Sequence, residues 1–267
     1  MGTPLSALGD RSPRFRICAR LDIKGENLIK GIQYEGLRVL GDPVEFAQRY
    51  YREGADELLF IDAVASLYGR NQLTEIIESI SKKLFIPLTV GGGIKDLETA
   101  DSVFYAGADK VLLNTAVIES PELIEVIAAK YGSQAVILSI QAKKNGAGGW
   151  NALTHGGREW TNVDVVEWMR QAESLGAGEV CITSVDRDGT QLGLDLDLMR
   201  SAVNQTRVPV IFGGGVASMT DVKDIAESGF SAVAIGASLH YGKLKLPEIR
   251  GFGYQKGFIT KEGTRSA

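Results

Sequence analysis

Apolar and β-branched residues gather in short runs along the chain, and between these runs apolar residues recur with a helical period. The runs predict buried strands over 15–22, 57–62, 86–90, 109–114, 135–141, 179–183, 208–212 and 231–236. The segments between them predict helices over 43–53, 71–84, 96–106, 121–130, 162–175, 196–204 and 219–227. This alternation in a chain of 267 residues predicts an α/β protein, a closed (β/α)8 TIM barrel.

The two ends of the chain depart from this alternation. Residues 1–14 contain no apolar core of the kind found in secretion signals, so we expect a disordered N-terminal extension and a cytoplasmic protein. From Tyr241 onward, Pro247 and five glycines interrupt the helical pattern, which predicts an irregular C-terminal segment over 241–267. The barrel itself is then expected to span 15–240.

The sequence repeats itself at one fixed offset. The segments GADELLFID and GAGEVCITS begin 122 positions apart, at Gly54 and Gly176. The same offset separates PLTVGGGI from PVIFGGGV, and GADKVLLNTA from GFSAVAIGAS. Three matches at one offset, with shared glycines and prolines, are not expected from strand composition alone. The barrel is therefore predicted to consist of two homologous half-barrels.

Composition narrows the class of protein further. The chain is 44% hydrophobic and 23% charged, which supports a full core and excludes a wholly disordered chain. The net charge is −4 and no apolar run reaches the ~20 residues of a membrane span, so we expect neither nucleic acid nor a membrane as partner. Cys18 and Cys181 lie in apolar runs, and His155 and His240 lack companions at metal-ligand spacing. We therefore expect no disulfide, metal or cofactor, and a solvated His155 in its Gly-rich loop.

Two glycine-rich turns are candidates for phosphate binding. VGGGI (90–94) and FGGGV (212–216) each follow a predicted strand, and turns without side chains let backbone N–H groups approach an anion. Tight βα turns also need glycine, but the repeat pairs each run with the loop after the next strand. We therefore predict two phosphate sites on opposite sides of the barrel mouth, and a phosphate diester or bis-phosphate as ligand. The candidate residues are Gly92, Gly93, Asn114 and Thr115 at one site, and Gly214, Gly215, Ala237 and Ser238 at the other.

Polar residues at the same end of the barrel are candidates for chemistry. Asp22 closes the first strand, where it is either a general acid or base or an ion-pair partner of Lys24 or Lys30. Lys30 lies in a loop long enough to fold over the site, and the polar loop SVDRDGTQLG (184–193) follows the sixth strand. The repeat aligns Asp22 with Gln141, and an amide cannot exchange a proton near neutral pH. One member of a symmetric acid–base pair is therefore missing.

Charged residues begin four strands at the opposite end of the barrel. They are Arg16, Glu57, Lys110 and Glu179. Strand alternation places Arg16 on the same side as Asp22, Lys110 with Asn114 and Glu179 with Thr183, although a single residue at such a position often turns outward to solvent. Because buried charges need partners, four charges of balanced sign predict a salt-bridged ring on the barrel floor. A ring in that place can act as a gate.

These motifs make the chain resemble the cyclase subunit of imidazole glycerol phosphate synthase (HisF) over roughly 15–241. ARLDIK, VGGGI, GADKVLLNTA, SVDRDGT and GAS follow one another in the order of that family. The isomerase of the same pathway shares the barrel and a similar RDGT, but NTA and SVDRDGT are closer to the cyclase. The resemblance implies a glutamine amidotransferase complex. A separate HisH-like glutaminase docks on the barrel floor, and its ammonia passes through the barrel to a phosphorylated substrate at the mouth.

The resemblance also implies roles for individual residues. Asp22 corresponds to one catalytic aspartate of the family, and Lys30 to the lysine of its mobile loop. Asp188 and Gly189 join the second phosphate site. The four charged residues of the floor correspond to the family's ammonia gate, and Asp109 to a partner-facing position beside it.

Three departures from the family concern the mouth and the chain end. Gln141 replaces the second catalytic aspartate, Gln33 replaces a different polar residue, and RGFGYQKGF replaces the terminal helix. An intact conduit below altered chemistry is the pattern expected of HisF-like paralogues that serve nucleotide-sugar amidation in surface polysaccharide (O-antigen) biosynthesis. There, ammonia converts an acetamido group into an acetamidino group on a third protein.

The sequence thus leaves several functions open. The preferred hypothesis is an ammonia-conducting subunit without cyclase activity, whose mouth contacts a sugar amidotransferase. The alternative is a genuine imidazole glycerol phosphate synthase cyclase, a lyase of histidine biosynthesis, which would lack a group typically worth ~10²–10⁴-fold in rate. A non-catalytic scaffold that activates the glutaminase is the third. A Gln141 engineered into an ordinary cyclase would also give this sequence.

Overall fold

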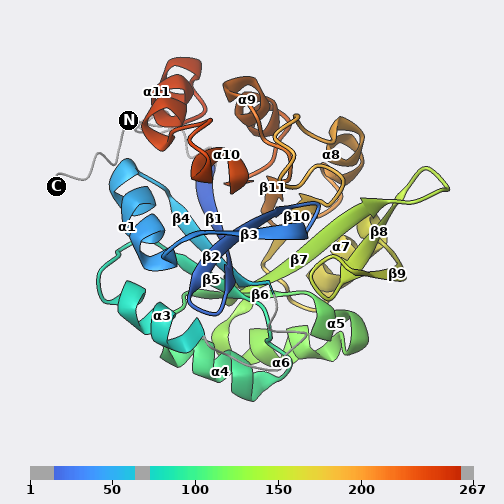
Figure 1. Cartoon of the computed structure of the whole chain (residues 1–267). Helices are drawn as coiled ribbons and strands as arrows, with labels where there is room; N and C mark the ends of the chain where they lie inside the picture. Colours follow the sequence, from blue (N-terminus) through green and yellow to red (C-terminus); the bar gives the residue numbers. More distant parts are fainter. Residues whose placement is uncertain (1–14, 64–72, 260–267) are drawn as a thin grey trace, which may run out of the picture.

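Eight parallel strands close into a barrel in the computed structural model, which describes residues 15–63 and 73–259 (Figure 1). In ring order they are β1 (Arg16–Lys24), β4 (Glu57–Asp62), β5 (Leu88–Gly91), β6 (Lys110–Leu113), β7 (Val136–Lys144), β10 (Glu179–Ser184), β11 (Val210–Gly213) and β12 (Ala232–Ile235). The ring closes where β12 pairs in parallel with β1, Ala232 opposite Arg16. The predicted (β/α)8 barrel is therefore confirmed, while the predicted extension 1–14 lies outside the described residues.

Helices surround the barrel (Figure 1). They are α1 (Pro43–Glu53), α3 (Leu73–Ser81), α4 (Leu97–Tyr105), α5 (Thr115–Glu119), α6 (Glu122–Tyr131), α7 (Val165–Ser174), α8 (Leu196–Ala202), α9 (Met219–Glu227), α10 (Ala237–His240) and α11 (Leu246–Lys256), with a 3-10 turn η2 (Ser133–Ala135). The predicted helices 43–53 and 219–227 have the bounds of α1 and α9. Within the described ranges, no helix combines the length and the apolar character needed to cross a bilayer.

Strand alternation divides the side chains of the barrel between two layers. On β1, Ile17, Ala19 and Leu21 point outward and pack into the main core under the helices. The opposite positions point into the bore, where a second cluster fills the middle. This inner apolar layer consists of Cys18, Leu59, Leu112, Ile137, Cys181, Ile211, Ala232 and Ala234. The bore is thus packed rather than open, as is usual for this architecture.

Each half-barrel carries an antiparallel hairpin after its first strand, which the sequence analysis did not predict. β2 (Asn27–Ile32) and β3 (Glu35–Gly41) follow β1, and β8 (Trp150–Thr154) and β9 (Glu159–Asp164) follow β7. Asp22 of β1 pairs with Ile29 of β2, and Gln141 of β7 pairs with Leu153 of β8, so the hairpins occupy corresponding places. Figure 1 shows β2 and β3 lying across the barrel mouth. The helix predicted from residue 162 begins at Val165 because β9 occupies the preceding residues.

The C-terminal cover is more regular than expected. α11 is a helix of 11 residues that begins beside Pro247, at a position where the missing N–H costs no hydrogen bond. A Cβ at Gly253 would lie 2.5 Å from the side chain of Ile259, so the chain after the helix folds back closely onto it there. The predicted irregular segment over 241–267 is corrected accordingly for its described part.

Two glycines give a test of how tightly the barrel is packed. A Cβ at Gly178 would lie 2.3 Å from the carbonyl oxygen of Ser133, whereas a Cβ at Gly251 in α11 meets no atom within 4 Å. We expect Gly178→Ala to lower the free energy of unfolding by about 1–3 kcal/mol through overpacking. Gly251→Ala is the control and should raise it by up to about 1 kcal/mol, because alanine favours helix. Denaturant unfolding measures both, and equal effects would contradict this packing.

Candidate functional site

Four charged side chains meet on the floor of the bore. They are Arg16, Glu57, Lys110 and Glu179. Arg16 donates to Glu57 at 2.6 Å and to Glu179. Lys110 Nζ lies 2.9 Å from Glu179 and 3.3 Å from Glu57. All four side chains face inward, and two cations balance two anions in a closed set of ion pairs. We call this set the floor ring.

The surroundings of the floor ring stabilise the charged form of Lys110. Burial alone would lower the pKa of Lys110, but Glu57 and Glu179 raise it above its usual value. Thr89, which the sequence analysis did not single out, is fully buried and donates to Glu57 Oε1 at 2.5 Å. Asp109 precedes Lys110 and is exposed on the floor, where its carboxylate accepts from the backbone N–H of Leu88 at 2.8 Å. A group that enters the bore from below therefore meets fixed charges first.

A second set of ion pairs lies at the mouth of the barrel, above the inner apolar layer. It consists of Arg20, Asp22, Lys30 and Asp188, each at most 6% exposed. Lys30 Nζ lies 2.8 Å from carboxylate oxygens of both Asp22 and Asp188. Arg20 Nε donates to the other oxygen of Asp22, also at 2.8 Å. We call this set the mouth lattice, and it again contains two cations and two anions.

The mouth lattice holds Asp22 in its ionised form. Burial alone would raise the pKa of Asp22, but Arg20 and Lys30 lower it far below its usual value. The carboxylate therefore accepts hydrogen bonds at neutral pH and has no proton to donate. Because its pKa is lower in the folded than in the unfolded chain, Asp22 stabilises the fold above about pH 4. That stabilisation is lost as the pH falls toward the folded pKa.

Hydrogen bonds from the tip of the first hairpin hold it over the mouth. The backbone N–H of Gln33 donates to the carbonyl of Asp188, and its side-chain amide donates to the carbonyl of Asp186, each at 2.8 Å. A Cβ at Gly189 would lie 2.1 Å from the carbonyl oxygen of Gly31, and Gly189 has a φ of 73°. Only glycine therefore allows the hairpin to approach this loop so closely. The expected folding of Lys30 over the site is present in this conformation.

A cavity of about 310 Å³ opens on one side of the mouth. Its lining includes Gly92, Gly93, Asn114, Thr115, Asp22 and Gln141. A Cβ at Gly92 would lie 2.3 Å from the carbonyl oxygen of Asp62, and Gly92 and Gly93 both have positive φ. These residues of the first predicted phosphate site are therefore brought together with both aligned positions of the acid–base pair.

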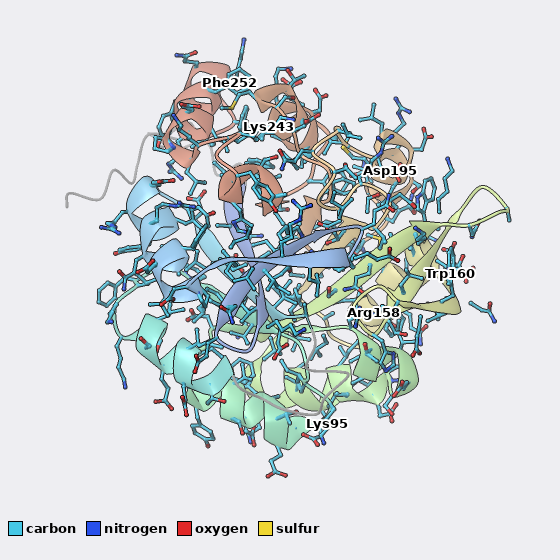
Figure 2. All side chains as sticks on the ribbon, viewed as in Figure 1. Lys95, Arg158, Trp160, Asp195, Lys243 and Phe252 are labelled. Carbon is cyan, nitrogen blue, oxygen red and sulfur yellow. The ribbon has the colours of Figure 1, made fainter. Side chains whose placement is uncertain are left out.

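A much smaller cavity, of about 20 Å³, lies on the other side. It is lined by Asp188, Gly189, Gly214, Gly215, Ala237 and Ser238, which form the second predicted phosphate site. Ser238 is buried and donates its hydroxyl proton to the carbonyl of Val216. Figure 2 shows Lys95, which lines the larger cavity, and Lys243, which donates to Gln191 at the smaller one, on opposite sides of the barrel. The two glycine turns thus face two separate recesses.

Gln141 is buried in the larger cavity with only 8% of its surface exposed. Its Oε1 has no hydrogen-bond partner among the described residues. The same holds for Oδ1 of Asn114, whose Nδ2 donates to the carbonyl of Leu153 at 3.2 Å. Buried acceptors without partners are rare, so both oxygens suit a ligand that offers N–H or O–H groups.

His155 and His240 have different surroundings. His155 was expected to be solvated, but it is half-buried and lines the larger cavity, where its backbone N–H donates to Thr115 Oγ1 at 3.0 Å. The second hairpin carries it there, and the sequence analysis did not predict that hairpin. His240 lies 2.7 Å from the hydroxyl of Tyr50, and burial lowers its pKa to about 4.

The chain is similar to known proteins over most of its length. Residues 16–245 match the family described as "Histidine biosynthesis protein". A Legionella pneumophila protein named imidazole glycerol phosphate synthase subunit HisF is 50% identical over 206 residues, which cover 77% of this chain and 97% of that protein. A Thermobifida fusca protein of the same name is 41% identical over 248 residues, which cover 91% of this chain and 97% of that protein.

Two lysine–aspartate ion pairs with the same N–O distance test how much the mouth lattice contributes to the free energy of unfolding. Lys30 and Asp22 are buried 2.8 Å apart, while Lys130 and Asp101 pair at 2.8 Å on the surface. We expect Lys30→Met to lower the free energy of unfolding by about 3 kcal/mol, because it leaves buried carboxylates short of a cation. Lys130→Met should change it little, because water screens that pair. Denaturant unfolding at neutral pH measures both changes. Equal changes in the free energy of unfolding in the two variants would contradict the role of burial.

Proposed function

Because this chain belongs to the histidine biosynthesis protein family as a HisF-like member, we propose that it is the ammonia-accepting subunit of a glutamine amidotransferase. A separate glutaminase subunit supplies ammonia at the barrel floor. The ammonia moves along the bore and reacts at the mouth with a phosphorylated substrate. The observation that carries this proposal is the layered bore, in which the floor ring, the inner apolar layer and the mouth follow one another.

Each layer suits one step of this transfer. The floor ring is polar and buried, so only a small group that can exchange hydrogen bonds with its charges passes it. The inner apolar layer favours neutral ammonia over ammonium, because an unpaired charge costs far more to desolvate than a neutral amine. Leu112 belongs to this layer and also lines the larger cavity, so the layer borders directly on the place of reaction.

The two recesses at the mouth support a substrate with phosphoryl groups at both ends. Glycine turns on each side present backbone N–H groups without side chains in the way, as anion sites require. Gly92 and Gly93 serve the larger recess, and Gly214 and Gly215 the smaller. The unpartnered oxygens of Gln141 and Asn114 lie at the larger recess and suit the amine and hydroxyl groups of the substrate between its ends.

Two reactions are compatible with ammonia delivery at this mouth. The name of the relatives favours the synthesis of imidazole glycerol phosphate. Nucleotide-sugar amidation on a third protein is favoured by a different observation. Asp22 is an ion-paired carboxylate and Gln141 cannot ionise, so these two aligned positions do not supply a free pair of proton-transfer groups. In this second reaction the barrel delivers ammonia and leaves proton transfer to its partner.

A cyclase assay separates the two reactions. We expect this chain, supplied with ammonium salt and the phosphoribosyl precursor of imidazole glycerol phosphate, to turn over about 10²–10⁴-fold more slowly than the Thermobifida fusca subunit. The physical reason is the missing ionisable group at position 141. Product formation is measured under identical conditions for both proteins. Equal turnover would exclude the amidation reaction as the explanation and assign this chain the synthase reaction with Gln141 in place.

Loss of the floor ring tests ammonia transfer independently of the reaction at the mouth. Lys110→Ala leaves Glu57 and Glu179 with one cation fewer, so the ring no longer separates the bore from solvent. In complex with a HisH-type glutaminase we expect more free ammonia per glutamate formed, measured by enzymatic ammonia detection in the presence of acceptor substrate. Lys130→Ala, on the outer surface, is the control. An unchanged ratio in Lys110→Ala would contradict the gate.

A further inference from the structure

Arg20 is a buried cation at the mouth whose every nitrogen has a partner. Its Nε donates to Asp22 at 2.8 Å, one terminal nitrogen donates to Thr183 Oγ1 at 3.0 Å, and the other to the hydroxyl of Tyr34 at 3.1 Å. The three partners come from β1, β10 and the tip of the first hairpin. A side chain that donates a hydrogen bond from each of its three nitrogens in this way is fixed in place.

Arg20 stands between the two recesses. It lines both the cavity of about 310 Å³ and the cavity of about 20 Å³, while only 6% of its surface is exposed. Its position follows from strand alternation, since Arg16, Cys18, Arg20 and Asp22 all point into the bore from β1. The guanidinium is thus part of the inner wall of the mouth and belongs to neither glycine turn.

Together with Lys30, Arg20 occupies both oxygens of Asp22. Arg20 binds Oδ1 and Lys30 binds Oδ2. A carboxylate held by two permanent cations is a weak base and keeps no proton to donate, so it has lost both functions of a general acid–base group. Asp22 then serves as the counter-ion that allows two cations to be buried.

We propose that Arg20 is a positioning residue that holds Asp22 as a counter-ion and thereby keeps Asp22 from taking part in proton transfer at the mouth of this barrel. The inference rests on the proposed function in one respect, since it concerns which reaction follows ammonia delivery. It adds that two residues, Gln141 and Arg20, distinguish this mouth from one with a working acid–base pair. Restoring a carboxylate at position 141 is not sufficient while Arg20 remains.

The direct test follows the titration of Asp22 by carbon-13 NMR of its carboxyl group. In the intact chain we expect Asp22 to stay ionised to the lowest pH at which the protein is folded. In Arg20→Gln, which keeps a hydrogen-bonding side chain without the charge, its midpoint should rise by about one pH unit or more. Arg38→Gln, at an exposed arginine on β3, is the matched control and should not move it.

Two results of the titration would overturn the proposal. One is a midpoint near pH 4 for Asp22 in the intact chain, which needs no variant and so does not depend on whether Arg20→Gln folds. The other is an unchanged midpoint in a folded Arg20→Gln. Both readouts concern a proton on one carboxyl group, so a merely structural effect of Arg20 on stability would not produce the expected shift.

The functional test compares Gln141→Asp with the double variant Arg20→Gln/Gln141→Asp in the cyclase assay with ammonium salt. We expect the double variant to be at least about tenfold faster than Gln141→Asp alone, since only the double variant has two carboxyl groups free of Arg20. Equal rates in active variants would overturn the proposal. If no variant forms imidazole glycerol phosphate, the synthase reaction fails, while the titration still decides the role of Arg20.

Discussion

The structure depends on the neutralisation of eight charges at the two ends of a closed barrel, six on its parallel strands and two, Lys30 and Asp188, on the first hairpin and on the loop after β10. Inward positions on parallel strands have no route to bulk water except at the two ends, so every ionic side chain there must find a partner within the bore. The floor ring and the mouth lattice each meet this requirement with two cations and two anions. The inner apolar layer separates them. Ion pairs thus lie at both ends of the bore, and apolar side chains are packed between them.

Much of the barrel was predictable because its strands are buried on both faces. Such strands read as short apolar runs, and the repeat at one offset shows where corresponding strands begin. The hairpins were missed for a local reason. The turn of the first one places Gln33 and Tyr34 at φ of 52° and 64°, a conformation that sequence signals assign to Asn-Gly or Gly-Gly. Contacts of Gln33 with the loop at 186–188 stabilise this turn, and such tertiary contacts leave no local signal.

The residues of the site likewise divide into those with a local sequence signal and those whose role depends on tertiary contacts. The members of the floor ring begin their strands, where a charge before an apolar run is easily noticed, and the balanced signs of the four charges predicted that they point inward and pair. Arg20 obeys the same alternation, two residues before Asp22, yet its partners Thr183 and Tyr34 come from distant segments. When these partners are not known, the sequence predicts that an arginine near a strand end extends to solvent. The glycine turns were recognisable from sequence, whereas the unequal size of the two recesses was not.

The two half-barrels explain why glutamine fits at position 141. Two residues before Asp22 the first half carries Arg20, and two residues before Gln141 the second half carries Ser139. Ile29 pairs with Asp22, and Leu153 pairs with Gln141. The residues that follow Ile29 and Leu153 are Lys30 and Thr154. One half therefore surrounds its carboxylate with two cations, while the other presents hydroxyl groups around an amide. A carboxylate at position 141 would be buried without a cation from either position, at a high desolvation cost. Gln141 and the mouth lattice are thus two parts of one arrangement, in which the first half-barrel carries charges at these corresponding positions and the second half-barrel carries neutral hydrogen-bonding groups there.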